Sequence, residues 1–196
     1  VQYAQKVTHK VENKRERAIR LFYAVRDDIF YDAYNLELVP GKMKASYTLN
    51  VKKGWCVTKA ILLAAVCRVV GIPSRLGFAD VQNHITTEKL RRAMEKEAYL
   101  YHGYTEIFLH KRWIKVTPAF NLSLCEKFHI KPLEFDGKND SQFHEYDAIC
   151  TSYGKMHQYD NTLIYIDLII YRKIVVQCAA YFPIIGNTPF GDVVRK

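Results

Sequence analysis

Hydrophobic residues recur at helical spacing in two stretches of the chain. In residues 14–30 they lie on one face of a predicted helix, opposite arginines and glutamates, as is typical of an amphipathic helix. Residues 55–70 are apolar on nearly every side, and Gly71 and Pro73 then supply the signals that end a helix. This second stretch is predicted to be a buried central helix.

Strand patterns follow the central helix. Residues 75–81 are predicted to form a strand, whereas residues 88–98 have the charge density of an exposed helix. Beyond residue 121 the sequence is rich in loop-forming residues. The tail at 150–196 contains strand-like runs without a motif and stays unassigned.

A β-hairpin is predicted just before this loop-rich region. Residues 99–110 alternate between two faces, and a short polar connection leads to a second strand at residues 113–117. A two-residue turn at positions 110 and 111 would make Thr117 a diagonal neighbour of His102 on the same face of the sheet. The predicted fold class is therefore α+β, with a central helix packed on an antiparallel sheet.

The composition is that of an ordinary globular protein, with 49% hydrophobic and 25% charged residues. We predict one domain over residues 1–196, with a core at roughly 14–146. The net charge of +9 would suit a nucleic acid, but the lysines and arginines are scattered and no aromatic stacking motif accompanies them. We expect a solvated surface and no nucleic-acid partner.

The longest apolar stretch, residues 163–182, is interrupted by three charged residues, so it falls short of the ~20 residues that cross a bilayer. We expect no membrane partner. The five cysteines are odd in number and lack C-x-x-C pairs or zinc-like spacing. We expect reduced thiols in a cytoplasmic setting and no metal or cofactor; the sequence leaves the oligomeric state open.

Cys56 is the candidate nucleophile. It lies at the first turn of the central helix, where the helix dipole and unpaired backbone N–H groups would lower the thiol pKa and could also hold an oxyanion. Cys67, eleven residues further on, is assigned to the core, because a cysteine in a buried helix is usually a small hydrophobic residue. The other three cysteines receive the same assignment.

The order of several motifs resembles the transglutaminase-like superfamily over roughly residues 31–146. The matching runs are Gly54-Trp55-Cys56, Gly71-Ile72-Pro73-Ser74-Arg75, His102-Gly103-Tyr104-Thr105-Glu106 and Trp113-Ile114-Lys115-Val116-Thr117-Pro118. In that family the cysteine heads the central helix, a histidine opens a strand, and an aspartate comes at the end of the next strand. The resemblance implies a papain-like fold with His102 as the base of Cys56.

The sequence departs from the family at the third catalytic position, where Thr117 replaces the usual acid. A threonine hydroxyl can accept an imidazole N–H bond but cannot stabilise an imidazolium by charge. Thr117 is our first candidate by position, followed by Asn121 by chemistry and Glu106 by strand face. Trp55, beside the nucleophile, is a candidate substrate-binding residue, although such a tryptophan more often packs in the core.

The sequence thus predicts cysteine-dependent acyl chemistry on amide bonds through a Cys56–His102 thiolate–imidazole pair and a covalent thioester. A peptide or protein would be the substrate, and the resemblance favours a hydrolase over an acyltransferase. The alternative is a catalytically silent relative that binds a peptide or protein in the former cleft. The missing acid is the main argument for that alternative.

Overall fold

A computed structural model describes residues 1–34, 38–82 and 98–142, with the backbone alone at 80–82 and 98–101. All of these residues lie in one compact unit, which the contacts delimit as Val1–Tyr159. The helix predicted at 88–98 falls almost entirely outside the described residues. So does the tail at 150–196.

A three-stranded antiparallel sheet supports the fold. Its order is β3 (Ser74–Gln82), β4 (Ala98–Leu109) and β5 (Arg112–Val116). The β4–β5 turn consists of His110 and Lys111, which have φ angles of 50° and 63°, as a two-residue hairpin turn requires. This turn fixes the predicted register, in which Leu109 pairs with Arg112 and Thr105 with Val116.

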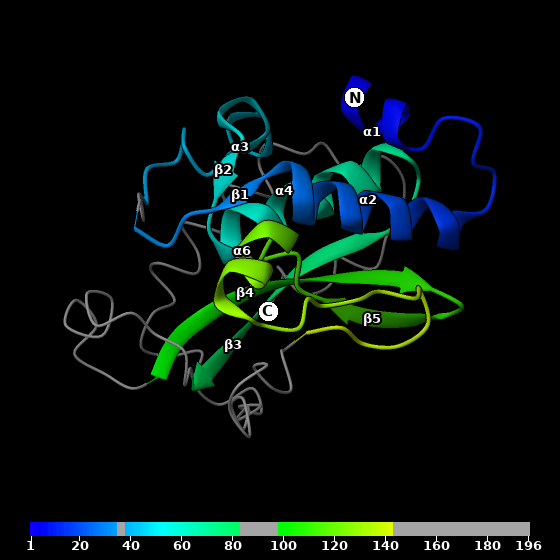
Figure 1. Ribbon diagram of the computed structural model, residues 1–196. Helices are drawn as coiled ribbons and strands as arrows, with labels where there is room; N and C mark the ends of the chain where they lie inside the picture. The colour runs from blue at the N-terminus through cyan, green and yellow to red at the C-terminus, as the bar shows by residue number, and fades with distance from the viewer. Residues whose placement is uncertain (35–37, 83–97, 143–196) are drawn as a thin grey trace, which may run out of the picture. The chain divides into compact units, whose positions relative to one another are not determined.

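Helix α4 (Cys56–Val69) packs on this sheet as the predicted central helix (Figure 1). All of its residues from Cys56 to Cys67 are buried, because its apolar surface meets β3 and β4 on one side and other helices on the other. The Thr105 hydroxyl in β4 donates a hydrogen bond of 2.9 Å to the Ala60 carbonyl oxygen. This bond ties the helix to the middle strand.

Helix α2 (Lys14–Asp28) packs against α4, and its buried side is the apolar face that the sequence pattern predicted. Asn13 caps it, since the side-chain oxygen accepts hydrogen bonds from the N–H groups of Arg15 and Glu16. The short helix α1 (Gln2–Val7) contacts both α2 and α4. The hydrophobic core therefore lies between these helices and the sheet.

Besides α1, four short elements were not predicted. Helix α3 (Ala45–Val51) leads into β2 (Lys53–Gly54), which pairs in parallel with β1 (Phe30–Tyr31), and helix α6 (Leu122–Phe128) lies in the stretch expected to be loop. The β1–β2 pairing matters for the site, because it brings the end of the α2 segment alongside the residues that precede Cys56. The α+β fold class is confirmed.

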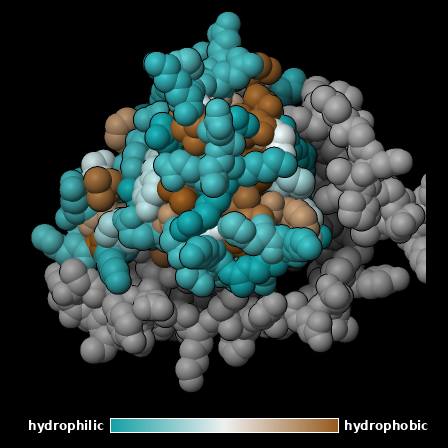
Figure 2. Space-filling model, turned by 90° about the vertical axis from the view of Figure 1, so that its right-hand side faces the viewer, coloured by the Kyte–Doolittle hydropathy of each residue, from teal (hydrophilic) through white to brown (hydrophobic). Residues whose placement is uncertain are grey.

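Most of the coloured residues on the face shown in Figure 2 are hydrophilic, and the hydrophobic ones form separate groups there. In the described part of the chain, every helix is too short or too polar to span a bilayer.

Candidate functional site

Cys56 is the first residue of α4, as the sequence predicts, and 7% of its surface is exposed. The helix start is fixed by Thr58, whose hydroxyl accepts a hydrogen bond of 3.0 Å from the Trp55 backbone N–H. Gly54, just before, must be a glycine, because an added Cβ would lie 2.6 Å from the Thr58 hydroxyl oxygen. The sequence around Cys56 thus fixes the start of α4, from which the thiol projects.

Strand β4 meets the first turn of α4 at Gly103, directly after His102. A Cβ added at Gly103 would lie 2.8 Å from the Cα of Val57, so only a glycine allows this approach. The backbone N–H groups of Gly103, Val57 and Cys56 itself face the Cys56 sulfur and favour its thiolate form, Gly103 most strongly. The structure therefore brings the His102–Gly103 segment to the thiol, as the predicted pair requires, and His102 is half-buried.

Gly103 is a site residue that the sequence reasoning passed over, although it stood within the quoted motif. The available signal was a glycine inside a predicted strand, which often marks a close approach of another backbone.

The protonation of Cys56 differs from the sequence expectation. Burial raises the pKa of the Cys56 thiol from 9.0 to about 11, and the three N–H groups at the sulfur oppose this rise without cancelling it. The prediction of a lowered pKa was therefore wrong, because the docking of β4 buries the helix start. At neutral pH the sulfur is a thiol, and it needs a base before it can attack.

Thr117 follows β5, and it is the residue that we predicted to replace the family's acid. Its hydroxyl is buried, with 3% of the residue exposed, and it makes no hydrogen bond with the residues that the structure describes. The expected bond from the His102 imidazole to this hydroxyl is therefore not made. The β4–β5 ladder ends one residue earlier, at Thr105–Val116, and the Thr117 backbone N–H bonds instead to the Ser141 carbonyl oxygen at 2.9 Å.

The two other orienting candidates are engaged elsewhere. The Asn121 side-chain oxygen accepts a hydrogen bond of 2.9 Å from the Tyr31 N–H, and its nitrogen donates one of 2.7 Å to the Ser123 hydroxyl. Glu106 forms an ion pair with Arg75 across the β3–β4 ladder. Asn121 thus ties the start of α6 to β1, and Glu106 secures the sheet.

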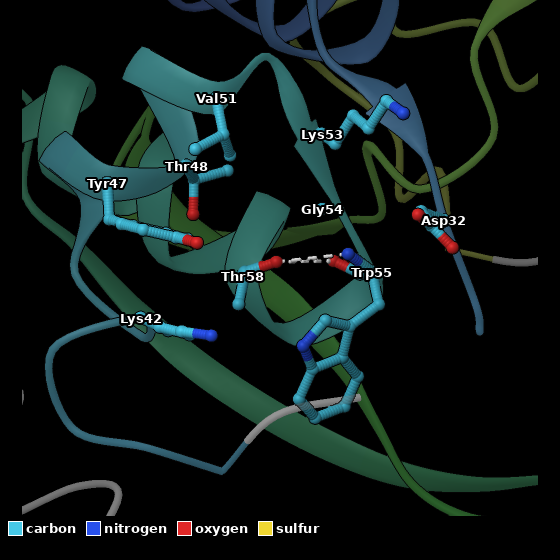
Figure 3. Close-up of a pocket in the computed structure, with 9 residues that line it drawn as sticks. All are labelled: Asp32, Lys42, Tyr47, Thr48, Val51, Lys53, Gly54, Trp55 and Thr58. Atoms are coloured by element: carbon cyan, nitrogen blue, oxygen red, sulfur yellow. Dashed lines mark hydrogen bonds between the residues drawn. The ribbon is translucent and has the colours of Figure 1, made fainter. Parts of the chain in front are cut away.

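Trp55 lines a pocket of about 250 Å³ between α3, β2 and the start of α4 (Figure 3). Its place there agrees with a role in substrate binding, which stays a prediction. Among the other cysteines, Cys67 and Cys125 are fully buried, as expected of core residues, and burial raises their pKa values to about 12 and about 11. Cys150 and Cys178 lie outside the described residues.

Lys59 is a second residue that the sequence reasoning missed, because it lies within the apolar run of α4. Its side chain is fully buried, and its ammonium donates hydrogen bonds to the carbonyl oxygens of Arg26, at 2.9 Å, and Ile29, at 2.5 Å. These carbonyls end helix α2. Burial lowers the pKa of Lys59 from 10.5 to about 7.

A family model described as the transglutaminase-like superfamily matches residues 1–118, which is more than half of the chain. The chain belongs to the transglutaminase-like superfamily. The cysteine-headed helix and the histidine-bearing strand seen above are therefore the transglutaminase-like core of this protein.

Among solved structures, the chain is similar to a candidate cysteine protease from Cytophaga hutchinsonii, at 21% identity and with a TM-score of 0.46. The match covers 60% of this chain and 36% of that one, so this transglutaminase-like chain spans little more than a third of that structure's length. No curated protein gives a significant match.

Proposed function

We propose that the protein carries out cysteine-dependent acyl chemistry on amide bonds of a peptide or protein, with Cys56 as nucleophile and His102 as base. The observation that carries this proposal is the close approach of Gly103 in β4 to the first turn of α4, because it places the residue after His102 beside the thiol, whose sulfur the Gly103 N–H faces. Family membership supports the same chemistry. The described cysteines are free, in keeping with a reducing cytoplasmic compartment.

The raised pKa of Cys56 shapes the mechanism. Because the sulfur is protonated at rest, His102 acts as a general base that takes the thiol proton while the sulfur attacks the carbonyl carbon. The N–H groups of Val57 and Gly103 would then stabilise the oxyanion. His102 passes its proton to the leaving amine, which departs as the thioester forms.

The fate of the thioester decides between hydrolysis and acyl transfer. Attack by water, with His102 taking a proton from it, releases a carboxylic acid and returns the thiol. Attack by an amine gives a new amide instead. We favour water as the acceptor, so that the protein is a hydrolase.

The first step is testable with a small activated ester, p-nitrophenyl acetate. We expect Cys56 to become acetylated, as detected by intact mass and peptide mapping, and His102→Ala to slow this acylation by about 100-fold or more, as loss of a general base typically does. Cys67→Ala is the matched control and should acylate like the wild type, because Cys67 is a core residue. Equal rates in wild type and His102→Ala would contradict the proposal.

A second candidate function is peptide or protein binding by a catalytically silent relative. It is favoured by Thr117, which supplies no carboxylate and whose hydroxyl makes no hydrogen bond in the described part of the chain. In that case Cys56 should remain unacylated in the same experiment. Adding hydroxylamine as an alternative acceptor would distinguish slow breakdown of a thioester from its failure to form.

A further inference from the structure

The pocket beside the helix start presents polar groups from several elements. Lys42 and Tyr47 point toward Thr58 and Trp55, and Asp32 lies on the far side of Trp55 (Figure 3). The remaining lining residues are Thr48, Val51, Lys53 and Gly54. At about 250 Å³ the pocket lies below the ~300–1,000 Å³ range of drug-sized ligand sites, and it suits one side chain rather than a whole small molecule.

On the side of Lys42 and Tyr47 the pocket favours an anion. Lys42 is directed toward Thr58, whereas the side chain of Lys53 points away from Lys42 and Tyr47, and Asp32 lies on the far side of Trp55 (Figure 3). The ammonium of Lys42 and the hydroxyl of Tyr47 are directed into the same space from neighbouring segments (Figure 3). An ammonium and a hydroxyl donor that converge in this way match the two oxygens of a carboxylate.

The pocket adjoins the nucleophile. Trp55 lines it and immediately precedes Cys56, so their Cα atoms are about 3.8 Å apart. Thr58, two residues after Cys56 in α4, also lines the pocket, and the Cys56 sulfur lies near Gly103. A peptide with one side chain in the pocket would therefore lie across the helix start, within a few residues of the thiol.

We propose that this pocket is a subsite for an acidic side chain, in which Lys42 and Tyr47 bind the carboxylate of a glutamate or aspartate near the amide bond that Cys56 attacks. As a statement about substrate, the inference rests on the proposed function. It makes an acidic peptide segment the preferred substrate class.

Binding to a variant that cannot acylate tests the subsite separately from the chemistry. Of the two tryptophans, Trp113 lies in β5, so Trp113→Phe leaves Trp55 as the sole tryptophan reporter, and Cys56→Ala removes the nucleophile. The probes are N-acetyl-glutamate amide and N-acetyl-glutamine amide, which are nearly equal in shape and differ in charge. Titrations follow Trp55 fluorescence at constant ionic strength.

We expect the glutamate probe to bind about tenfold more tightly than the glutamine probe, since a hydrogen bond to a charged group supplies a preference of this size. Lys42→Met should abolish the preference and Tyr47→Phe should reduce it. Lys44→Met is the matched control, because Lys44 does not line the pocket, and it should keep the preference.

Equal affinity for the two probes, undetectable binding of the glutamate probe, or a preference that survives both Lys42→Met and Tyr47→Phe would overturn the inference. Circular dichroism establishes whether each variant is folded. If Lys42→Met does not fold, Tyr47→Phe still tests the subsite. The acylation experiment uses an acetyl group without a side chain for the pocket. A failed subsite and a failed catalytic proposal therefore give different results.

Discussion

At the residue scale, the protonation of Cys56 is decided by two opposing effects. A position at a helix N-terminus stabilises a negative charge by about 0.3–1 kcal/mol. The rise of the Cys56 pKa from 9.0 to about 11 corresponds to roughly 2.7 kcal/mol in favour of the thiol. Burial therefore outweighs the helix dipole. How deeply Cys56 is buried depends on the approach of β4, and the residues next to Cys56 in the sequence do not predict that approach.

Thr117 offers a direct test of the missing acid. We expect Thr117→Asp to raise the rate of Cys56 acylation by about tenfold or more, because a carboxylate can orient His102 and stabilise the imidazolium that forms. Thr117→Asn is the control, since it has nearly the same shape without the charge and should gain less. An aspartate variant that is folded, by circular dichroism, and no faster than the wild type would show that Thr117 does not occupy the acid's position.

Gly103 carries the contact between strand and nucleophile. Gly103→Ala should lower the free energy of unfolding by about 1–3 kcal/mol, because its Cβ would strike the Val57 backbone and force β4 away from α4. Acylation of Cys56 should slow as well, since the Gly103 N–H would leave the sulfur. Urea denaturation and acylation kinetics measure the two effects.

Gly41 provides the matched control for this substitution, because a Cβ added there meets no atom of the described residues within 4 Å. Gly41→Ala should change the free energy of unfolding by less than about 1 kcal/mol. If Gly103→Ala behaved in the same way, the close approach of β4 to α4 would not be a real constraint.

At the scale of elements, the parts of the fold with a repeating pattern were predictable. The amphipathic face of α2, the apolar run of α4 and the alternation of β4 follow the periods of helix and strand, and the two-residue turn at His110 and Lys111 set the hairpin register. Helices α3 and α6 have seven residues each, too few for a periodic signal. The β1–β2 pairing has two residues per strand and depends on tertiary contacts.

Lys59 shows what the pattern of α4 could not reveal. In the sequence, a lysine within an apolar run only breaks the hydrophobic pattern. In the structure, Lys59 donates hydrogen bonds to two carbonyl oxygens at the end of α2 that would otherwise have no partner within the helix. The partners are some thirty residues away, so only the packing of α2 against α4 explains why a lysine is suited to this position.

The buried lysine predicts a pH dependence of stability. The pKa of Lys59 is about 7 in the folded protein, compared with its ordinary value of 10.5, which applies to the unfolded chain. Between about pH 7 and pH 10.5 the unfolded chain therefore binds more protons than the folded protein, and the free energy of unfolding rises with pH. The slope from one such group is about 1.4 kcal/mol per pH unit. Cys56, Cys67 and Cys125 act oppositely above pH 9.0, because their pKa values are raised and the unfolded thiols ionise first.

The lysine effect is therefore best seen between about pH 7 and pH 8, before the thiols contribute. Urea denaturation in this window should give a free energy of unfolding that rises with pH for the wild type and stays flatter for Lys59→Met. Lys52→Met, at an exposed position, should keep the wild-type slope. Parallel pH profiles for Lys59→Met and wild type would show that Lys59 keeps its proton in the folded protein.

At the scale of the whole molecule, the folded unit extends beyond the family match at residues 1–118. Arg26 in α2 donates a hydrogen bond of 2.7 Å to the Leu133 carbonyl oxygen, and Tyr23 donates one of 2.6 Å to Glu134. Ser141 then bridges to Val116 at the free edge of β5. The stretch predicted as loop is thus attached to the core by contacts that leave no periodic signal in the sequence.

The same contacts bear on the net charge of +9. Several described cations already have partners within the chain: Arg26 pairs with Asp27 and Glu134, Arg75 with Glu106, and the Arg68 side chain donates to the Ser74 carbonyl oxygen. Nucleic-acid binding depends on many cations that face phosphates at once. In the part of the chain that the structure describes, the lysines and arginines are scattered and partly paired, and they do not provide that surface.

We therefore expect no tight binding of nucleic acid despite the basic composition. Fluorescence anisotropy with labelled duplex and single-stranded DNA should give, at physiological salt, an affinity no better than the non-specific range of about 10⁻⁴–10⁻⁶ M. The logarithm of any residual affinity should fall only shallowly with the logarithm of salt concentration, since few counterions are released. A submicromolar affinity whose salt dependence corresponds to about 6–10 phosphate contacts would require a continuous basic surface. That result would contradict our expectation of no nucleic-acid partner.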